Sequence, residues 1–210
     1  MRHVKSYRRG QLITESKLEY KTIINVDIQP EYKEYVTFNL YQWAKFINKK
    51  SKSNDIVFLY NGRDTLGMVS ENDYKMWLME LGIKNRVIED AMFYDKGYAF
   101  FRTCMDEGID DDAIVDLVKY MIRHNINDSR DINEEMWNDF MEETNHSRQD
   151  VRDLLEEAGD MINIPDLMDF LSRYKNIVLT GGGVAECLKE VEIALMSLDR
   201  KYEVLRKYTY

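Results

Sequence analysis

Three side chains that can do chemistry stand at the ends of three apolar stretches of the sequence. Asp27 lies at the end of the stretch 22–28, Lys96 follows a weaker apolar stretch within 86–97, and Cys187 follows the strand and glycine turn of 176–183. If these stretches are neighbouring parallel strands, their carboxyl ends share one edge of a sheet, where α/β proteins place their sites. A thiol, a carboxylate and an ammonium group there would supply a nucleophile, its base and a balancing charge.

Cys187 falls in the first turn of a predicted helix over 185–200. Free backbone N–H groups and the helix dipole at that position favour a thiolate and can hold a developing oxyanion. The glycines at 181–183 allow the backbone to approach a substrate closely. Each residue also has a simpler interpretation. A buried cysteine packs as a small apolar side chain, a strand-end Asp27 caps a turn, and Lys96 extends over the surface.

The glycine turn does not match either common phosphate-binding motif. A dinucleotide fingerprint needs a third glycine where this sequence has Glu186, whose carboxylate would repel a pyrophosphate. A P-loop needs a lysine after its last glycine, and none follows Gly183. The turn is therefore interpreted as part of a site for a nucleophile.

The elements that must position these residues alternate along the chain. Strands are predicted within 22–28, 55–62, 86–97, 176–183 and 202–210, and helices over 38–51, 71–83 and 185–200. This alternation predicts an α/β fold, a three-layer Rossmann-like parallel sheet with helices on both faces. We assign this domain to 21–105 and 164–210. Residues 1–20, polar and basic, form an N-terminal arm or a leader strand.

The segment 106–163 departs from the alternation and is predicted to be an acidic helical insertion. Residues 106–160 contain 18 Asp or Glu and five Lys or Arg, within a chain whose formal net charge is −9. The overall charge argues against nucleic acid or an anionic membrane as a partner. The insertion suits a lid, an interface of a homo-oligomer, or a surface for a basic protein partner.

Cysteine content and hydropathy indicate a cytoplasmic protein. Cys104 and Cys187 are the two cysteines, too few for a disulfide framework. No apolar run approaches the roughly 18 residues of a membrane-spanning helix. The basic N-terminal stretch lacks the apolar core of a secretory signal.

The three stretches together resemble the isochorismatase-like cysteine hydrolases, the superfamily that includes the nicotinamidases. The first strand of that family ends D-x-Q-x-[DE]-[FY], and its nucleophile follows a strand, a glycine and a short loop. The matching segments here are "DIQPEY" from Asp27 to Tyr32, "KGYAFFRT" from Lys96 to Thr103, and "IVLTGGGVAECLKEVEIAL" with Gly181, Cys187 and Ala194. The resemblance covers roughly residues 22–103 and 175–210.

The resemblance implies a hydrolase that acts on a small amide or related C–N bond through a thioester on Cys187. Asp27 would be the general base, and Lys96 would hold it ionised and stabilise the thiolate. The backbone N–H groups of Gly183 and Cys187 would form the oxyanion hole. Tyr32 and Phe100 would line the substrate pocket, and no cofactor is implied.

The sequence also departs from this family. Nicotinamidases carry a metal site with an Asp-x-His element, but Asp64 has no such histidine, and the three histidines are His3, His124 and His146. We therefore expect no metal. The insertion is long, and the chain ends at Tyr210, which implies a shortened C-terminus. These departures leave an alternative, a catalytically degenerate protein of the same fold that serves as a structural or protein-binding subunit.

Overall fold

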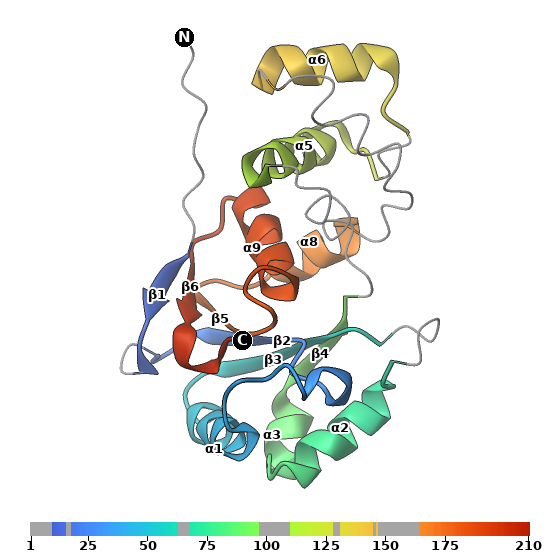
Figure 1. Ribbon diagram of the computed structural model, residues 1–210. Coiled ribbons are helices and arrows are strands. Elements are labelled where there is room, and N and C mark those ends of the chain that lie inside the picture. Colours follow the sequence, from blue (N-terminus) through green and yellow to red (C-terminus); the bar gives the residue numbers. More distant parts are fainter. Residues whose placement is uncertain are drawn as a thin grey trace. The chain divides into compact units, whose positions relative to one another are not determined.

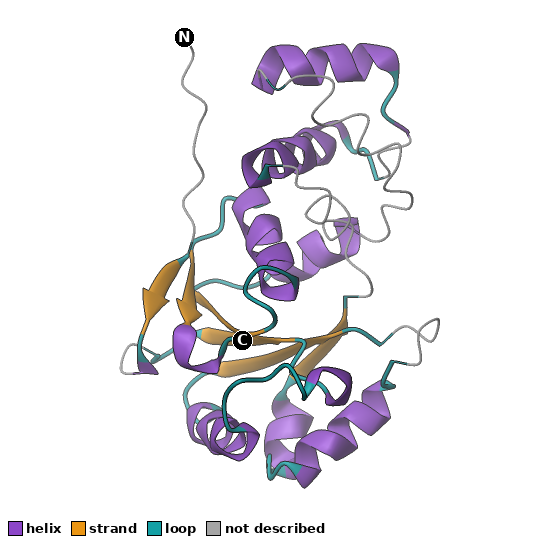
Figure 2. Cartoon of the chain, in the orientation of Figure 1, coloured by secondary structure: helices purple, strands orange, loops and turns teal. Residues whose placement is uncertain are grey.

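A single six-stranded parallel sheet organises the part of the chain that carries the candidate residues. The computed structural model describes residues 10–15, 18–62, 68–96, 110–127, 131–144, 146 and 164–210. The order of the strands is β1-β6-β5-β2-β3-β4, and all five neighbouring pairs are parallel (Figures 1 and 2). The strands are β1 (Gln11–Ile13), β2 (Thr22–Val26), β3 (Asp55–Tyr60), β4 (Met92–Asp95), β5 (Ile177–Gly181) and β6 (Tyr202–Leu205). The predicted three-layer Rossmann-like α/β fold, with helices on both faces and a helical insertion, is confirmed.

The chain packs as two compact units. Of the described residues, one unit contains 10–15, 18–62, 68–96, 174–191 and 201–210, and the other contains 110–127, 131–144, 146, 164–173 and 192–200. The sheet lies in the first unit, together with α1 (Leu40–Lys50), α2 (Glu71–Glu80), α3 (Asn85–Asp90) and the start of α9 (Cys187–Ser197). The second unit contains α5 (Asp111–His124), α6 (Glu134–Thr144), α8 (Ile164–Ser172) and the rest of α9. All the candidate residues with described positions belong to the first unit.

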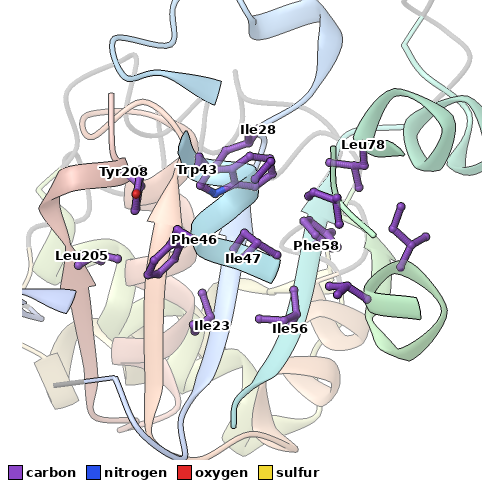
Figure 3. Packing of buried hydrophobic residues seen from close by; sticks show 14 of the residues in the cluster. Ile23, Ile28, Trp43, Phe46, Ile47, Ile56, Phe58, Leu78, Leu205 and Tyr208 are labelled. Atoms are coloured by element: carbon purple, nitrogen blue, oxygen red, sulfur yellow. The ribbon is translucent and has the colours of Figure 1, made fainter. Parts of the chain in front are cut away.

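The central strands are buried along their whole length. Every residue of β2 and β5 is buried, because helices cover both faces of a parallel sheet. On one face, Ile23, Ile56 and Phe58 pack against Trp43 and Ile47 of α1 (Figure 3). This packing holds the strands rigidly up to the edge where the candidate residues lie.

A buried polar group ties three strands together just before Asp27. The Asn25 side chain donates to the carbonyl of Val57 at 3.0 Å. Its oxygen accepts hydrogen bonds from Trp43 Nε1 at 3.2 Å and Thr180 Oγ1 at 2.8 Å. Because these groups are buried, each hydrogen bond offsets a desolvation cost and fixes the relative register of β2, β3 and β5.

Two predicted elements differ from the structure. The range 86–97 contains the predicted weak strand, β4, but also the helix α3, whose six residues are too few to show a helical period. The last strand ends at Leu205 and a 3-10 turn, Arg206–Tyr208, follows. In that turn the ring centroids of Tyr208 and Phe46 are 4.7 Å apart. This aromatic packing favours the turn over a longer strand.

Replacing Gly181 with alanine should destabilise the protein by about 1–3 kcal/mol more than the same change at Gly82. Both glycines have positive φ, +81° and +90°, so both substitutions carry a similar backbone strain. A Cβ at Gly181 would lie 2.2 Å from the carbonyl oxygen of Val26, whereas at Gly82 nothing lies within 4 Å. Urea denaturation of the two variants measures the difference, and equal losses would show that the clash is relieved without cost.

Among the described residues, no helix combines the length and the apolar character needed to cross a bilayer.

Candidate functional site

The candidate site lies at the point where the strand order reverses. From β2 the chain continues to β3 on one side, while from β5 it continues to β6 on the other, and β2 and β5 are neighbours. Asp27 directly follows β2, and the turn Gly182–Gly183 directly follows β5. Open α/β sheets bind ligands in the crevice outside the carboxyl ends of such strands.

Lys96 follows β4, which lies two strands away from β2 in the sheet, yet its side chain reaches Asp27. Its backbone N–H donates to the carbonyl of Tyr60 at 2.9 Å, which continues the pairing of β4 with β3. Since β3 separates β4 from β2, the two strands are about 10 Å apart. The four-carbon stem of the lysine spans β3, and Nζ reaches Asp27 Oδ2 at 2.9 Å.

The charges at the site are almost completely removed from water. The exposed fractions of the Asp27 and Lys96 side chains are 0% and 3%. Glu190, in the first turn of α9, adds a second carboxylate, with Oε2 at 3.5 Å from Lys96 Nζ. Burial lowers the pKa of Lys96, but Asp27 and Glu190 outweigh it and raise this pKa above its usual range. Lys96 is therefore a fixed cation.

The thiol of Cys187 is half-buried and lies close enough to this charged group for its charges to act on the thiol. Burial is the largest influence on it and raises its pKa well above the usual range. The nearby charge of Asp27 acts in the same direction, as does its carboxylate as a hydrogen-bond acceptor for the thiol. Lys96 opposes them and Glu190 adds to them. The position at a helix end favoured a thiolate in the sequence analysis, but burial and two carboxylates hold the resting side chain as a thiol.

Asp27 is held in an unusual backbone conformation. Its φ is +46°, in the left-handed region that non-glycine residues seldom adopt. Its N–H donates to the carbonyl of Leu59 at 2.9 Å, and its own carbonyl accepts from the Tyr210 hydroxyl at 2.9 Å. Besides the ion pair with Lys96, no nitrogen or oxygen donor in the described part of the chain makes a regular hydrogen bond to its carboxylate. The carboxylate thus keeps the capacity to accept a proton.

Among the described residues, the turn between β5 and α9 leaves three backbone amides without an acceptor, those of Gly183, Ala185 and Cys187. The N–H of Gly182 donates to the carbonyl of Val26 at 2.6 Å, and that of Val184 donates to the carbonyl of Tyr210 at 2.8 Å. The N–H groups of Gly183 and Cys187 donate to no acceptor within the described residues. Both residues are half-buried, so these donors suit the oxyanion hole predicted from the sequence.

Polar and aromatic side chains complete the described surroundings of the thiol. Gln29 accepts from the N–H of Asn61 at 2.9 Å and donates to its carbonyl at 3.2 Å, which fixes the chain just after β3. Asn61 also hydrogen-bonds Tyr32, whose pKa is raised to about 12, first by burial and then by Asp27 and Cys187. Burial and Asp27 likewise raise the pKa of Tyr210 above its usual range. Both phenols are therefore neutral donors.

The structure thus brings together most of the residues that the sequence analysis selected. Asp27, Lys96, Cys187 and Tyr32 converge, and Gly183 lies in the turn beside them. Phe100 lies outside the described residues. Glu190 and Tyr210 were missed. Glu190 stands three residues after Cys187, a spacing that puts both on one face of a helix, so its position was a usable signal. Tyr210 offered none.

No metal centre is evident in the portion of the chain described. There, no group of three or more His, Cys, Asp or Glu side chains has the arrangement to hold an ion. His146 Nε2 lies 3.0 Å from Asp116 Oδ2, and the rings of His124 and Tyr120 pack at a tilt of 32° with their centroids 4.3 Å apart. Both histidines belong to the unit that lacks the sheet.

The alkylation of Cys187 should reflect its raised pKa. Because the thiolate is the nucleophile, the rate with iodoacetamide should keep rising above about pH 9, where an ordinary thiol levels off. Quantifying the alkylated Cys187 peptide by mass spectrometry at a series of pH values measures this rate. A plateau reached by neutral pH would instead indicate a stabilised thiolate.

Comparison of the chain with protein-family models, with curated proteins and with solved structures finds no match to any of them.

Proposed function

We propose that this protein is a cysteine hydrolase of the isochorismatase-like type, acting on a small amide or related C–N bond. The observation that carries the proposal is the half-buried thiol of Cys187 against the fully buried Asp27–Lys96 ion pair. Its location where the strand order reverses supports the same conclusion. A carboxylate that is buried, ion-paired and close to a thiol contributes little to packing, whereas it suits proton transfer.

The reaction begins with a neutral thiol. As Cys187 Sγ attacks the carbonyl carbon, its proton passes to the Asp27 carboxylate, so that no free thiolate forms in the resting site. The carbonyl oxygen becomes an oxyanion that accepts from the N–H groups of Gly183 and Cys187. Collapse of this intermediate breaks the C–N bond, and the leaving nitrogen takes the proton from Asp27.

Water then completes the cycle. Asp27, ionised again, accepts a proton from a water molecule as its oxygen attacks the thioester carbonyl. The C–S bond breaks, the acid leaves, and the proton returns to Cys187. Lys96 stays charged throughout, because its raised pKa keeps the proton on it, and its role is to balance and orient Asp27.

The test is capture of the acyl-enzyme. Intact-mass spectrometry after mixing with a small activated ester should show one acyl group, and peptide mapping should place it on Cys187. Cys187→Ala should remove the adduct and Cys104→Ala should retain it. Release of ammonia from a panel of small primary amides then measures turnover. A folded protein that forms no adduct on Cys187 and releases no ammonia would favour the structural or protein-binding alternative.

A further inference from the structure

Tyr210 contacts both halves of the candidate site. Its hydroxyl donates to the carbonyl of Asp27, directly after β2, at 2.9 Å. Its own carbonyl accepts from the N–H of Val184 at 2.8 Å, and its N–H donates to the carbonyl of Gly182 at 3.4 Å. One residue therefore links the backbone of the proposed base to the turn that carries the proposed oxyanion hole.

The hydroxyl helps to hold a backbone conformation that is unfavourable by itself. Asp27 has a φ of +46°, and a strained backbone of this kind persists only where its surroundings fix it. The N–H of Asp27 is fixed by the carbonyl of Leu59, which continues the pairing of β2 with β3. The carbonyl of Asp27 is fixed by Tyr210. Because the backbone torsions set the direction of a side chain, a shift of this carbonyl would turn the carboxylate away from Lys96 and Cys187.

The backbone of Tyr210 orients the turn after β5 in a corresponding way. The peptide between Gly182 and Gly183 is trans, so the carbonyl of Gly182 and the N–H of Gly183 point in opposite directions. The N–H of Tyr210 holds that carbonyl on one side of the turn. The N–H of Gly183 therefore points away from Tyr210, where it can donate to a substrate oxygen.

We infer that Tyr210 is a positioning residue, whose hydroxyl keeps the carboxylate of Asp27 directed at Cys187. Its ring packs against Phe38, with the centroids 6.3 Å apart, which seats the hydroxyl at Asp27. Since the hydroxyl is bonded to a backbone carbonyl, it acts on the reaction through Asp27. The inference rests on the proposed function only for the reaction that this base serves.

The experiment removes the hydroxyl alone. Tyr210→Phe keeps the ring and its packing against Phe38. Tyr208→Phe is the matched control, because the Tyr208 ring also packs against Phe38 but its hydroxyl interacts with Lys207. Circular dichroism confirms that each variant is folded before its rates are compared.

We expect Tyr210→Phe to speed the alkylation of Cys187 by iodoacetamide at pH 9 about threefold. With its backbone released, the Asp27 carboxylate lies farther from the thiol, so its charge opposes thiolate formation less. The same variant should slow the acylation of Cys187 by a small activated ester about tenfold, because the base is displaced. Mass spectrometry of the Cys187 peptide measures both rates, and Tyr208→Phe should leave both unchanged.

The double variant Tyr210→Phe/Asp27→Asn distinguishes positioning from packing. If the hydroxyl acts through the carboxylate of Asp27, its removal should change neither rate beyond the effect of Asp27→Asn alone. A packing change that only opens the site would speed alkylation equally in both backgrounds. That result would overturn the inference, as would wild-type rates in Tyr210→Phe or equal changes in Tyr208→Phe.

The two rates also separate this inference from the proposed function, because alkylation needs no turnover. An alkylation rate that depends on Tyr210 in a protein that forms no acyl adduct would support the inference and remove the proposed function. Acylation of Cys187 in the wild type, with both rates unchanged in Tyr210→Phe, would do the reverse.

Discussion

Asp27→Asn should slow the acylation of Cys187 by roughly 10²–10⁴-fold, the usual contribution of a positioned general base. The thiol is protonated at rest, and its proton must leave as sulfur attacks. Asparagine matches the carboxylate in shape but cannot accept that proton. Burial, the largest cause of the raised pKa of Cys187, persists in the variant, so few thiolates form spontaneously at neutral pH.

Alkylation gives a second measurement on the Asp27→Asn variant. Acylation should become slower, whereas alkylation at a given alkaline pH should become faster. Without the negative charge of Asp27, the pKa of Cys187 should fall, so its alkaline alkylation profile should move to lower pH. Asp55→Asn, at the exposed start of β3, is the control and should change neither measurement. Acylation at the wild-type rate in a folded Asp27→Asn protein would exclude this carboxylate as the base.

Lys96→Met should destabilise the fold by roughly 3–5 kcal/mol at neutral pH, since it removes the ammonium group that pairs with two buried carboxylates. Methionine retains most of the volume of the lysine stem, so the loss of stability arises mainly from the removed charge. Lys75→Met is the matched control. Lys75 pairs with Glu71, and the side chains are 32% and 47% exposed, so its loss should cost no more than about 1 kcal/mol.

The pH dependence identifies the origin of the loss. In the wild-type protein the raised pKa of Lys96 means that its contribution is complete below its unfolded pKa, and is lost as the pH rises through the folded one. The difference between wild type and Lys96→Met should therefore be large at neutral pH. It should shrink under alkaline conditions, as the pH rises through the raised folded pKa of Lys96. Urea denaturation at each pH measures it, and a loss independent of pH would point to packing instead.

The strands that carry the site were predictable because burial on both faces leaves a clear pattern. "TIINV" and "IVLTG" are mostly apolar or β-branched, and both proved to be fully buried central strands. The shorter helix α3 was not predicted, and neither was the turn after Leu205. Each is set by contacts with distant residues, such as that of Tyr208 with Phe46, more than by its own sequence.

The sequence by itself determined which reactive side chains stand at strand ends, because that depends on local order along the chain. Asp27, Lys96 and Cys187 were selected in this way, and the parallel sheet brings them together. Only the tertiary structure decided their ionisation and the charge of the site. Those properties depend on burial and on distances between residues remote in sequence. Glu190 beside Lys96 and the hydroxyl of Tyr210 on Asp27 therefore appear only when the chain is folded.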